Sequence, residues 1–217
     1  MLYDGQALPA DYRQRSKEQL RRIQMIYQIP DTALNPRQRI VDIIGRPLTF
    51  YLGLTGKALR QRVAELLEMI ELDPAKYMDR QPRELSGGQK QRICIARALA
   101  AEPELIICDE VTSALDQLVA EGVLKLLDRI QRQLGVSYLF ITHDVATVRA
   151  IADEVMVMQR GRVVDHGSRE AIFSPPYRDY TGLLFSSEPE MDPDWLDRLL
   201  ARRAGDSNLQ PVQGQPS

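Results

Sequence analysis

Two apolar segments, residues 105–108 and 138–142, are separated by a helical pattern from about Val119 to Leu134, and this arrangement constrains the fold more than any other feature of the sequence. The first segment is continuously apolar and is followed by Asp109-Glu110, which is typical of a strand buried on both faces whose C-terminal end carries chemistry. The second also ends in polar residues, His143-Asp144. Strand, helix and strand in this order predict a right-handed parallel crossover, so we expect an α/β protein.

Upstream of this unit the chain carries shorter local signals. Residues 2–8 resemble a short strand with a turn signal at Asp4-Gly5. Residues 12–22 are rich in arginine and lysine. We interpret them as a solvated helix face in preference to a nucleic-acid-binding patch. Residues 23–28 predict a further strand.

Residues 38–72 show a helical pattern that proline and glycine interrupt. Ahead of it, Pro30 and the Asn35-Pro36 pair predict a loop. Within it we expect breaks at Pro47 and around the Gly53–Gly56 stretch. One face of the second helix is apolar and carries Val63, Leu66, Leu67 and Ile70. The pattern therefore predicts a small helical insert.

Two further elements complete the pattern. A helix follows Ser86-Gly87-Gly88 and runs to about Ala101, ahead of Pro103. Segments 155–158 and 162–165 are separated by Arg160-Gly161 and predict a hairpin.

Composition excludes several classes of protein. With 44% hydrophobic and 27% charged residues in 217, the chain is neither disordered nor a coiled coil. A net charge of −2 does not indicate binding to duplex nucleic acid. No apolar run approaches the ~18 residues that cross a bilayer, and the first residues lack the apolar segment of a secretory signal. The two cysteines, Cys94 and Cys108, do not make a disulfide framework, so we expect a reducing cytoplasm.

The start of the helix at Ser86-Gly87-Gly88 is an anion site in principle, because backbone N–H groups and the positive helix end point to the same spot. A glycine pair alone is weak support. The specific signal is an ordered combination: LSGGQKQRICIARAL, then LIICDE, then SALD, then ITHD. With this combination, residues 1–185 resemble the nucleotide-binding subunits of ATP-binding cassette (ABC) transporters.

The resemblance implies how two loops contact a second subunit. One is the family's signature motif, which contacts the γ-phosphate of ATP held by the opposite subunit of a dimer. It matches Leu85, Ser86, Gly87, Gly88 and Gln89. The other is the loop that communicates across the dimer, and it matches Ser113, Ala114, Leu115 and Asp116.

The resemblance also implies the hydrolytic residues. Asp109 matches the aspartate that orients Mg²⁺, and Glu110 matches the carboxylate that activates the attacking water. A helix cap is the structural alternative for this acidic pair. His143 matches the switch histidine that contacts the γ-phosphate. Gln28 matches the glutamine that reaches the metal and water, although Ile29 stands where the family usually has aspartate.

The phosphate-binding loop GxxxxGK[ST] does not occur in these 217 residues. The Gly56-Lys57 pair is followed by Ala58 and lies in the helical pattern, so we interpret it as a false match. In the family this loop and its strand precede Tyr3. We therefore expect no normal ATP affinity in the chain's own site and unpaired apolar strand edges, with either poor solubility alone or rescue by a missing upstream segment. We favour a truncated gene model, a split gene or a decayed gene over a purpose-built half-cassette.

The end of the chain resembles one branch of the family. IFSPPYRDYTGLLFSSEP and LNPR resemble sequences of importers for dipeptides, oligopeptides and nickel. The aromatic and leucine side chains of the first segment are expected to pack on the domain surface. Further on, an amphipathic helix is expected as a docking element, and it carries Trp195, Leu196, Leu199 and Leu200.

The fold class we expect is α/β: a P-loop NTPase-like ABC ATPase core, a parallel sheet with flanking helices, lacking its N-terminal strands and phosphate loop. A helical subdomain and a C-terminal extension are added to it. The expected divisions are 1–37 (core remnant with the glutamine loop), 38–84 (helical subdomain), 85–170 (core with the signature), 171–204 (extension) and 205–217 (disordered tail).

The resemblance implies an ATP-binding and ATP-hydrolysing subunit of an importer for peptides or related solutes, with ATP and Mg²⁺ as cofactors. Its partners would be a second ATPase subunit, transmembrane permease subunits and, indirectly, a solute-binding protein, with no nucleic acid. It would lie peripherally on the cytoplasmic face of the inner membrane. Two alternatives stay open: a catalytically silent partner that supplies only the signature in trans, and a soluble cassette protein outside transport.

Overall fold

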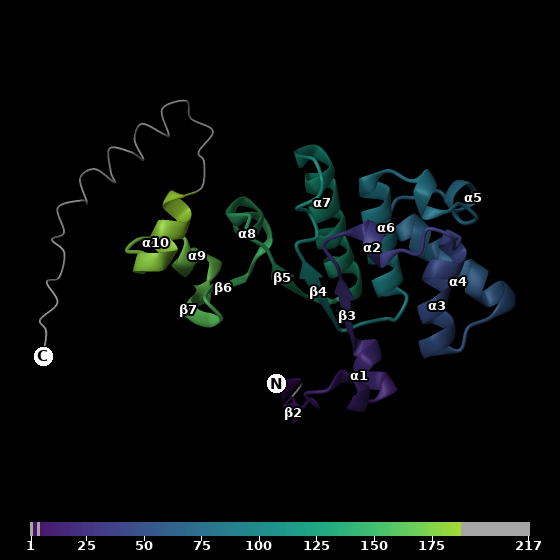
Figure 1. Cartoon of the computed structure of the whole chain (residues 1–217), viewed down its shortest axis with the longest axis horizontal. Helices are drawn as coiled ribbons and strands as arrows, with labels where there is room; N and C mark the ends of the chain where they lie inside the picture. The colour runs from purple at the N-terminus through teal and green to yellow at the C-terminus, as the bar shows by residue number, and fades with distance from the viewer. Residues whose placement is uncertain (1, 4, 188–217) are drawn as a thin grey trace, which may run out of the picture. The chain divides into compact units, whose positions relative to one another are not determined.

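The computed structural model describes residues 2–3 and 5–187 of the chain (Figure 1). The contacts between residues divide the chain into two compact units, Met1–His143 and Asp144–Ser217. The first unit contains a three-stranded sheet and most of the helices, and the second is built around an antiparallel pair of strands.

A parallel sheet forms the centre of the first unit. Its strands are β3 (Ile23–Ile26), β4 (Leu105–Asp109) and β5 (Ser137–Ile141), in the order β3-β4-β5. Helix α7 (Gln117–Leu134) connects β4 to β5. Both strand pairs are parallel, which confirms the strand, helix and strand arrangement predicted from the sequence.

The prediction that the 105–108 strand is buried on both faces is wrong. Ile106 and Cys108 are fully buried, whereas Leu105 and Ile107 are partly exposed. The buried pair belongs to a core cluster shared with residues of α6 (Gly87–Leu99) and α7. The alternation shows that one face of the sheet packs against helices and the other face is only partly covered.

Strand β5 pairs with β4 and with no other strand of the part of the chain that the structure describes. Leu139 and Ile141, which alternate with the half-buried Tyr138 and Phe140, are about half exposed. This arrangement matches the expectation of an unpaired strand edge with apolar side chains.

The helical insert contains α3 (Ile40–Leu52), α4 (Gly56–Met69), α5 (Pro74–Tyr77) and the short 3₁₀ helix η2 (Pro82–Glu84). The break expected at Pro47 does not occur, because α3 continues through it. Burial of the α3 face outweighs the roughly 3 kcal/mol that an interior proline costs. That face carries Ile40, Val41, Ile43, Ile44 and Leu48.

Two proline and glycine positions set the ends of short elements. Gly53 has a φ of 71° and caps α3, which confirms the break predicted there. Pro30 was expected to lie in a loop, but it begins the short helix α2 (Pro30–Ala33). Proline is favoured at the first helical position because its missing N–H has no helical partner there and its φ already suits a helix.

The N-terminal segment folds as a hairpin and not as one strand. Strands β1 (Leu2–Tyr3) and β2 (Gln6–Ala7) pair in antiparallel fashion, and Gly5 between them has a φ of 73°. This positive φ lets the chain reverse at Gly5, which is why the strand expected over residues 2–8 is divided.

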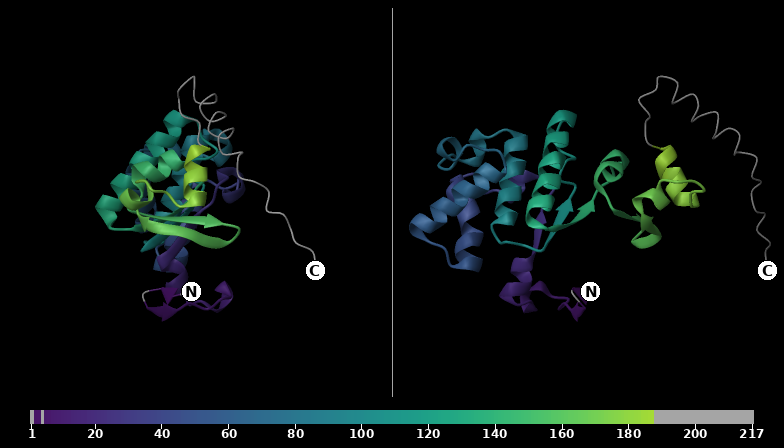
Figure 2. Two further views of the ribbon diagram at one scale, coloured as in Figure 1. Left: turned by 90° about the vertical axis from the view of Figure 1, so that its left-hand side faces the viewer. Right: turned by 180° about the vertical axis from the view of Figure 1, so that it is seen from behind.

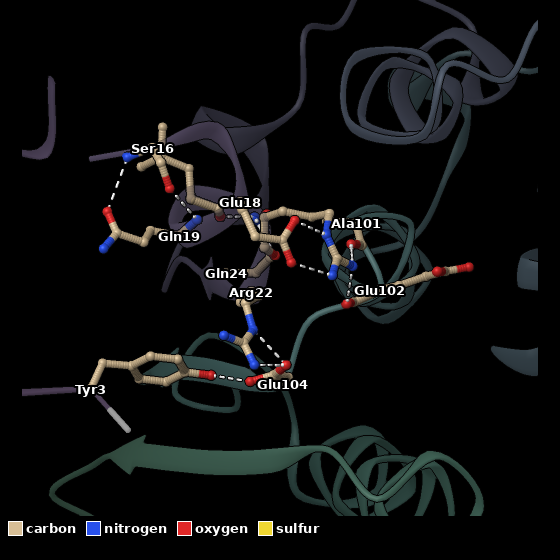
Figure 3. A network of polar contacts seen from close by, with 11 residues as sticks. Tyr3, Ser16, Glu18, Gln19, Arg22, Gln24, Ala101, Glu102 and Glu104 are labelled. Carbon is tan, nitrogen blue, oxygen red and sulfur yellow. Dashed lines mark hydrogen bonds and ion pairs between the residues drawn. The ribbon is translucent and has the colours of Figure 1, made fainter. Parts of the chain in front are cut away.

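The basic segment that follows is only partly the solvated helix face that we expected. It forms the 3₁₀ helix η1 (Tyr12–Gln14) and α1 (Lys17–Arg22), and Arg21 and Arg22 attach α1 to the loop before β4. Arg21 donates to the carbonyls of Ala101 and Glu102, and Arg22 pairs with Glu104 at 2.5 Å. Figure 3 shows this network, in which Tyr3 also donates to Glu104.

The core of the first unit joins the sheet to the insert. Its fully buried members include Ile26, Ile44, Leu67 and Ile93. Cys94 and Cys108 are buried free thiols, as expected of a chain without a disulfide framework. Burial raises the pKa of Cys94 to about 11 and that of Cys108 to about 12, so both stay protonated and unreactive near neutral pH.

The second unit begins with α8 (Val145–Ile151) and continues into the hairpin of β6 (Glu154–Gln159) and β7 (Arg162–Ser168), the light-green ribbon in the left view of Figure 2. Arg160 and Gly161 both have positive φ, which confirms the turn predicted between the strands. Short helices α9 (Arg169–Ile172) and α10 (Asp179–Ser186) follow.

Aromatic side chains of this extension pack against one another. The rings of Phe173 and Phe185 stack with centroids 4.7 Å apart, and Tyr177 meets Phe185 edge-on. The amphipathic helix around Trp195 and the tail 205–217 lie outside the described residues. No described helix is both long enough and apolar enough to span a bilayer.

Candidate functional site

Two acidic residues lie at the carboxyl end of β4. Asp109 is the last residue of the strand, and Glu110 follows it with its backbone N–H bonded to the carbonyl of Ile141 at 2.8 Å. Glu110 has a φ of 48°, which is uncommon for a residue with a side chain and is typical of strained positions at functional sites. The left-handed backbone turns the chain at the edge of the sheet, where all three parallel strands end.

Glu110 is contacted by side chains that follow the two neighbouring strands. Gln28, after β3, donates from Nε2 to Oε2 of Glu110 at 2.5 Å. His143, after β5, places Nδ1 3.1 Å from Oε1 of the same carboxylate. The side chain of His143 is 75% exposed and that of Glu110 is 27% exposed. The imidazole is therefore open to solvent, and the carboxylate is partly shielded. The three residues that sequence reasoning assigned to hydrolysis are therefore together.

The turn after Glu110 is tied to the same group. Ser113 donates from its hydroxyl to the carbonyl of Glu110 at 3.0 Å and accepts from Gln28 Nε2 at 3.3 Å. At the end of the turn, Asp116 caps α7 by accepting from the backbone of Val119 at 3.0 Å. The loop of Ser113, Ala114, Leu115 and Asp116 is thus bonded at one end to Gln28 and the Glu110 backbone and at the other to the start of α7.

The signature segment forms the N-terminus of α6. Ser86 is the N-cap, and its hydroxyl accepts from the backbone N–H of Gln89 at 3.3 Å. The Gln89 side chain accepts in return from the backbone N–H of Ser86 at 3.0 Å, which completes a capping box. The Ser86 O–H and the first backbone N–H groups of a 13-residue helix are thereby directed out of the N-terminus, where anions bind.

The two signature glycines lie against the 113–116 loop and the start of α7. A Cβ on Gly87 would lie 3.7 Å from Leu115, and a Cβ on Gly88 would lie 2.4 Å from Cγ1 of Val119. Gly88 therefore permits an approach between α6 and α7 that no larger residue allows.

Asp109 has the chemistry of a Mg²⁺ ligand. No cluster of three histidine, cysteine, aspartate or glutamate side chains able to hold a metal forms in the described residues. Mg²⁺ does not require such a cluster, because it keeps several waters and is bound by one or two carboxylates together with substrate phosphates. The partly exposed Asp109 carboxylate and the side-chain oxygen of Gln28 fit this pattern.

Three contacts around these motifs were not predicted from the sequence. Lys90 pairs with Asp31 at 2.6 Å, and Arg97 donates to the carbonyl of Ala33 at 2.5 Å, so α6 is bonded to the helix that follows Gln28. The seven-residue spacing of Lys90 and Arg97 indicates a common helix face, but not what that face meets. The third contact joins Tyr77 to Gln89 at 3.1 Å.

The Gly56-Lys57 pair lies where sequence reasoning placed it, in the helical insert. Gly56 begins α4, and the preceding Thr55 makes no side-chain cap. The strand, glycine loop and helix of a phosphate-binding loop are not formed there. The residues described here thus fit Mg²⁺ and the terminal phosphate, but none of them forms the usual cradle for the other phosphates.

Comparison with known proteins agrees with this geometry. Residues 1–113 match the protein family described as ABC transporter. The chain belongs to the ABC transporter family, which confirms the resemblance read from its motifs. Within the family it groups with ATP-binding subunits of the dipeptide and oligopeptide import branch.

Individual relatives illustrate this grouping. The dipeptide transport ATP-binding protein DppF of Haemophilus influenzae is 44% identical over 196 residues, which are 89% of this chain and 59% of DppF. A putative peptide import ATP-binding protein of Brucella abortus is 46% identical over 78% of this chain and 50% of its own length. The oligopeptide transport ATP-binding protein OppF of Escherichia coli is 45% identical over 79% and 52%. The chain thus spans about half to three-fifths of these relatives.

Solved structures share the fold. CbiO1 of Clostridium perfringens, part of the ABC transporter complex cbiONQ, gives a TM-score of 0.70 at 29% identity. The match covers 79% of this chain and 66% of CbiO1. The ATP-binding cassette MJ0796, in a dimeric post-hydrolysis state bound to ADP and Pi, gives 0.58 at 31% identity over 68% and 64%. Both comparisons support the α/β ABC ATPase fold, with its parallel sheet and helices.

Proposed function

We propose that the chain acts in an ABC importer for peptides or related small solutes, where it binds ATP together with a second ATPase subunit and couples hydrolysis to transport. The observation that carries this proposal is the convergence of Gln28 and His143 on the Glu110 carboxylate. The dipeptide and oligopeptide relatives support the choice of solute. Such a subunit binds permease subunits and lies on the cytoplasmic face of the membrane.

In this proposal Glu110 accepts the proton of the attacking water, and His143 and Gln28 orient the carboxylate and the water. A positioned general base contributes about 10² to 10⁴ in rate. Asp109 and the side-chain oxygen of Gln28 would hold Mg²⁺, and the ion would supply positive charge to neutralise the phosphates.

The signature face acts on a different nucleotide. Ser86, Gly87 and Gly88 present a hydroxyl and backbone N–H groups to the γ-phosphate of ATP that a second subunit holds. The chain can serve this role without a phosphate loop of its own, because the capping box that presents these groups lies within residues 86–89.

The proposal is tested by mixing the purified chain with a cassette of the same family that has an intact phosphate loop and an inactivated signature serine. We expect no ATP hydrolysis by either protein alone and hydrolysis by the mixture. Ser86→Ala in this chain is expected to abolish the gain. Glu110→Gln is expected to leave it unchanged, because the base of the composite site comes from the other subunit.

The outcomes separate the candidate functions. No gain in the mixture would contradict the role of the signature face. Hydrolysis by the chain alone that Glu110→Gln abolishes would contradict the expectation of an empty own site. A further variant fuses the phosphate-loop segment of a relative to the N-terminus of this chain. If Glu110→Gln leaves ATP hydrolysis unchanged both in this fusion protein and in the mixtures, the silent-partner alternative is favoured.

A further inference from the structure

Gln89 has a side chain whose two ends are both engaged. Its Oε1 accepts from the backbone N–H of Ser86 at 3.0 Å, and its Nε2 donates to the hydroxyl of Tyr77 at 3.1 Å. Only one orientation of the amide makes both bonds, because a flipped amide would place its NH₂ group against the N–H of Ser86. The Ser86 N–H sets this orientation, and the Tyr77 hydroxyl, which can donate or accept, holds the other end of the amide in place.

Tyr77 is itself firmly placed. It is the last residue of α5 and is 8% exposed. The Lys76 ammonium and the Arg80 guanidinium lie 5.4 and 5.2 Å from the centre of its ring, which favours cation–π attraction. The next residues are bonded to the start of α3, where Val41 and Ile40 donate to the carbonyls of Met78 and Arg80 at 2.9 Å. The hydroxyl is thus presented to Gln89 from the helical insert.

We propose that Tyr77 is a positioning residue for the signature segment, acting through Gln89 to hold the Ser86 cap and the first N–H groups of α6 in the geometry that meets a terminal phosphate. The inference rests on the proposed function of the signature face. It assigns to the helical insert a direct part in shaping that face, through one hydrogen bond from outside the motif.

Tyr77→Phe tests the inference, because it removes the hydroxyl and keeps the buried ring. In NMR spectra of the full chain, we expect the Gln89 side-chain NH₂ to exchange with water about two- to tenfold faster, the range expected for loss of one hydrogen bond. We also expect the Ser86 amide resonance to shift. Tyr51→Phe is the matched control, since the hydroxyl of Tyr51 makes no hydrogen bond to other described residues.

A ligand titration separates this inference from the proposed function. With inorganic tripolyphosphate as the probe, we expect the Gly87 and Gly88 amides to shift in the unmodified chain, and about two- to tenfold weaker binding in Tyr77→Phe. If the unmodified chain gives no response, the proposed role of the signature face is wrong, and the ligand-free measurements still test Tyr77. If Gln89 exchange and the Ser86 resonance match those of the unmodified chain, the positioning role is wrong.

Discussion

Gly88 on α6 faces Val119 on α7 so closely that a Cβ on Gly88 would lie 2.4 Å from Cγ1 of Val119. Because Val119 is β-branched and lies in a helix, its side chain has few alternative rotamers. We expect Gly88→Ala to lower the free energy of unfolding by about 1–3 kcal/mol, the usual cost of overpacking, although alanine favours helix. Urea titration of both proteins measures this difference.

Gly87 supplies the matched control, because a Cβ there would meet Leu115 at an ordinary 3.7 Å. Gly87→Ala is expected to leave stability unchanged or slightly raised. Adding Val119→Ala to Gly88→Ala is expected to recover part of the loss, and the double-mutant cycle isolates the contact. Equal changes in stability for the two glycine substitutions would contradict overpacking against Val119 as the cause of the loss in Gly88→Ala.

Gln91 is fully buried in α6, and neither end of its side-chain amide has a hydrogen-bond partner among the described residues. An unsatisfied buried polar group costs about 1–3 kcal/mol. Methionine has a similar length and no amide, so Gln91→Met is expected to raise the free energy of unfolding by about 1–2 kcal/mol. Gln91→Glu is expected to lower it. A loss of stability in Gln91→Met, measured in urea, would contradict the burial of an unpaired amide.

Glu71 joins the end of the helical insert to the core helices. Its carboxylate pairs with Arg92 on α6 at 2.5 Å and with Arg129 on α7 at 3.0 Å. The hydrogen bond from Arg92, with the charges of both guanidinium groups, lowers the pKa of Glu71 below its ordinary value of 4.5. A lowered folded-state pKa stabilises the protein above the unfolded-state pKa, and this contribution is lost as pH falls through the folded-state value.

We therefore expect Glu71→Gln to be less stable than the unmodified chain at pH 7 and nearly equal to it well below pH 4.5. The side chain is 48% exposed, so solvent screening limits the difference to about 1 kcal/mol or less. Thermal melts across pH measure it. Glu68→Gln, one turn earlier and without an ion pair among the described residues, is the control expected to leave stability at pH 7 unchanged. A difference that persists unchanged in acid would rule out the ion pairs as its source.

The parts of the site that sequence reasoning placed correctly follow from strand topology. Gln28, Glu110 and His143 each come directly after a strand, and parallel strands end at one edge of a sheet. Their assignment rested on the resemblance to the ABC family, and the strand order of the structure explains why the three side chains lie together. The turn at Arg160-Gly161 was also predictable, because its signal is local.

The errors and omissions depend on contacts between distant segments. Pro47 remains helical because the face of α3 is buried by elements far along the chain. Lys90 pairs with Asp31, which is 59 residues away in the sequence, and no sequence pattern around either residue indicates this ion pair. A glutamine in a helix suggests an exposed position, so the burial of Gln91 could not be predicted from its type. These features require the packed structure.

In the second unit, Asp165 holds α10 against the hairpin. Its carboxylate accepts from the buried hydroxyl of Thr181 at 2.7 Å and pairs with Arg178 at 3.1 Å. Asp165→Ala leaves the Thr181 hydroxyl without its acceptor, and we expect amide hydrogen exchange in α10 to become at least about fivefold faster, as a loss of 1 kcal/mol or more requires. Exchange in α8 should not change. Glu170→Ala, which removes the exposed pair with Arg169, is the control expected to leave α10 protected. Unchanged exchange in α10 after Asp165→Ala would contradict the role of Asp165 in holding α10 against the hairpin.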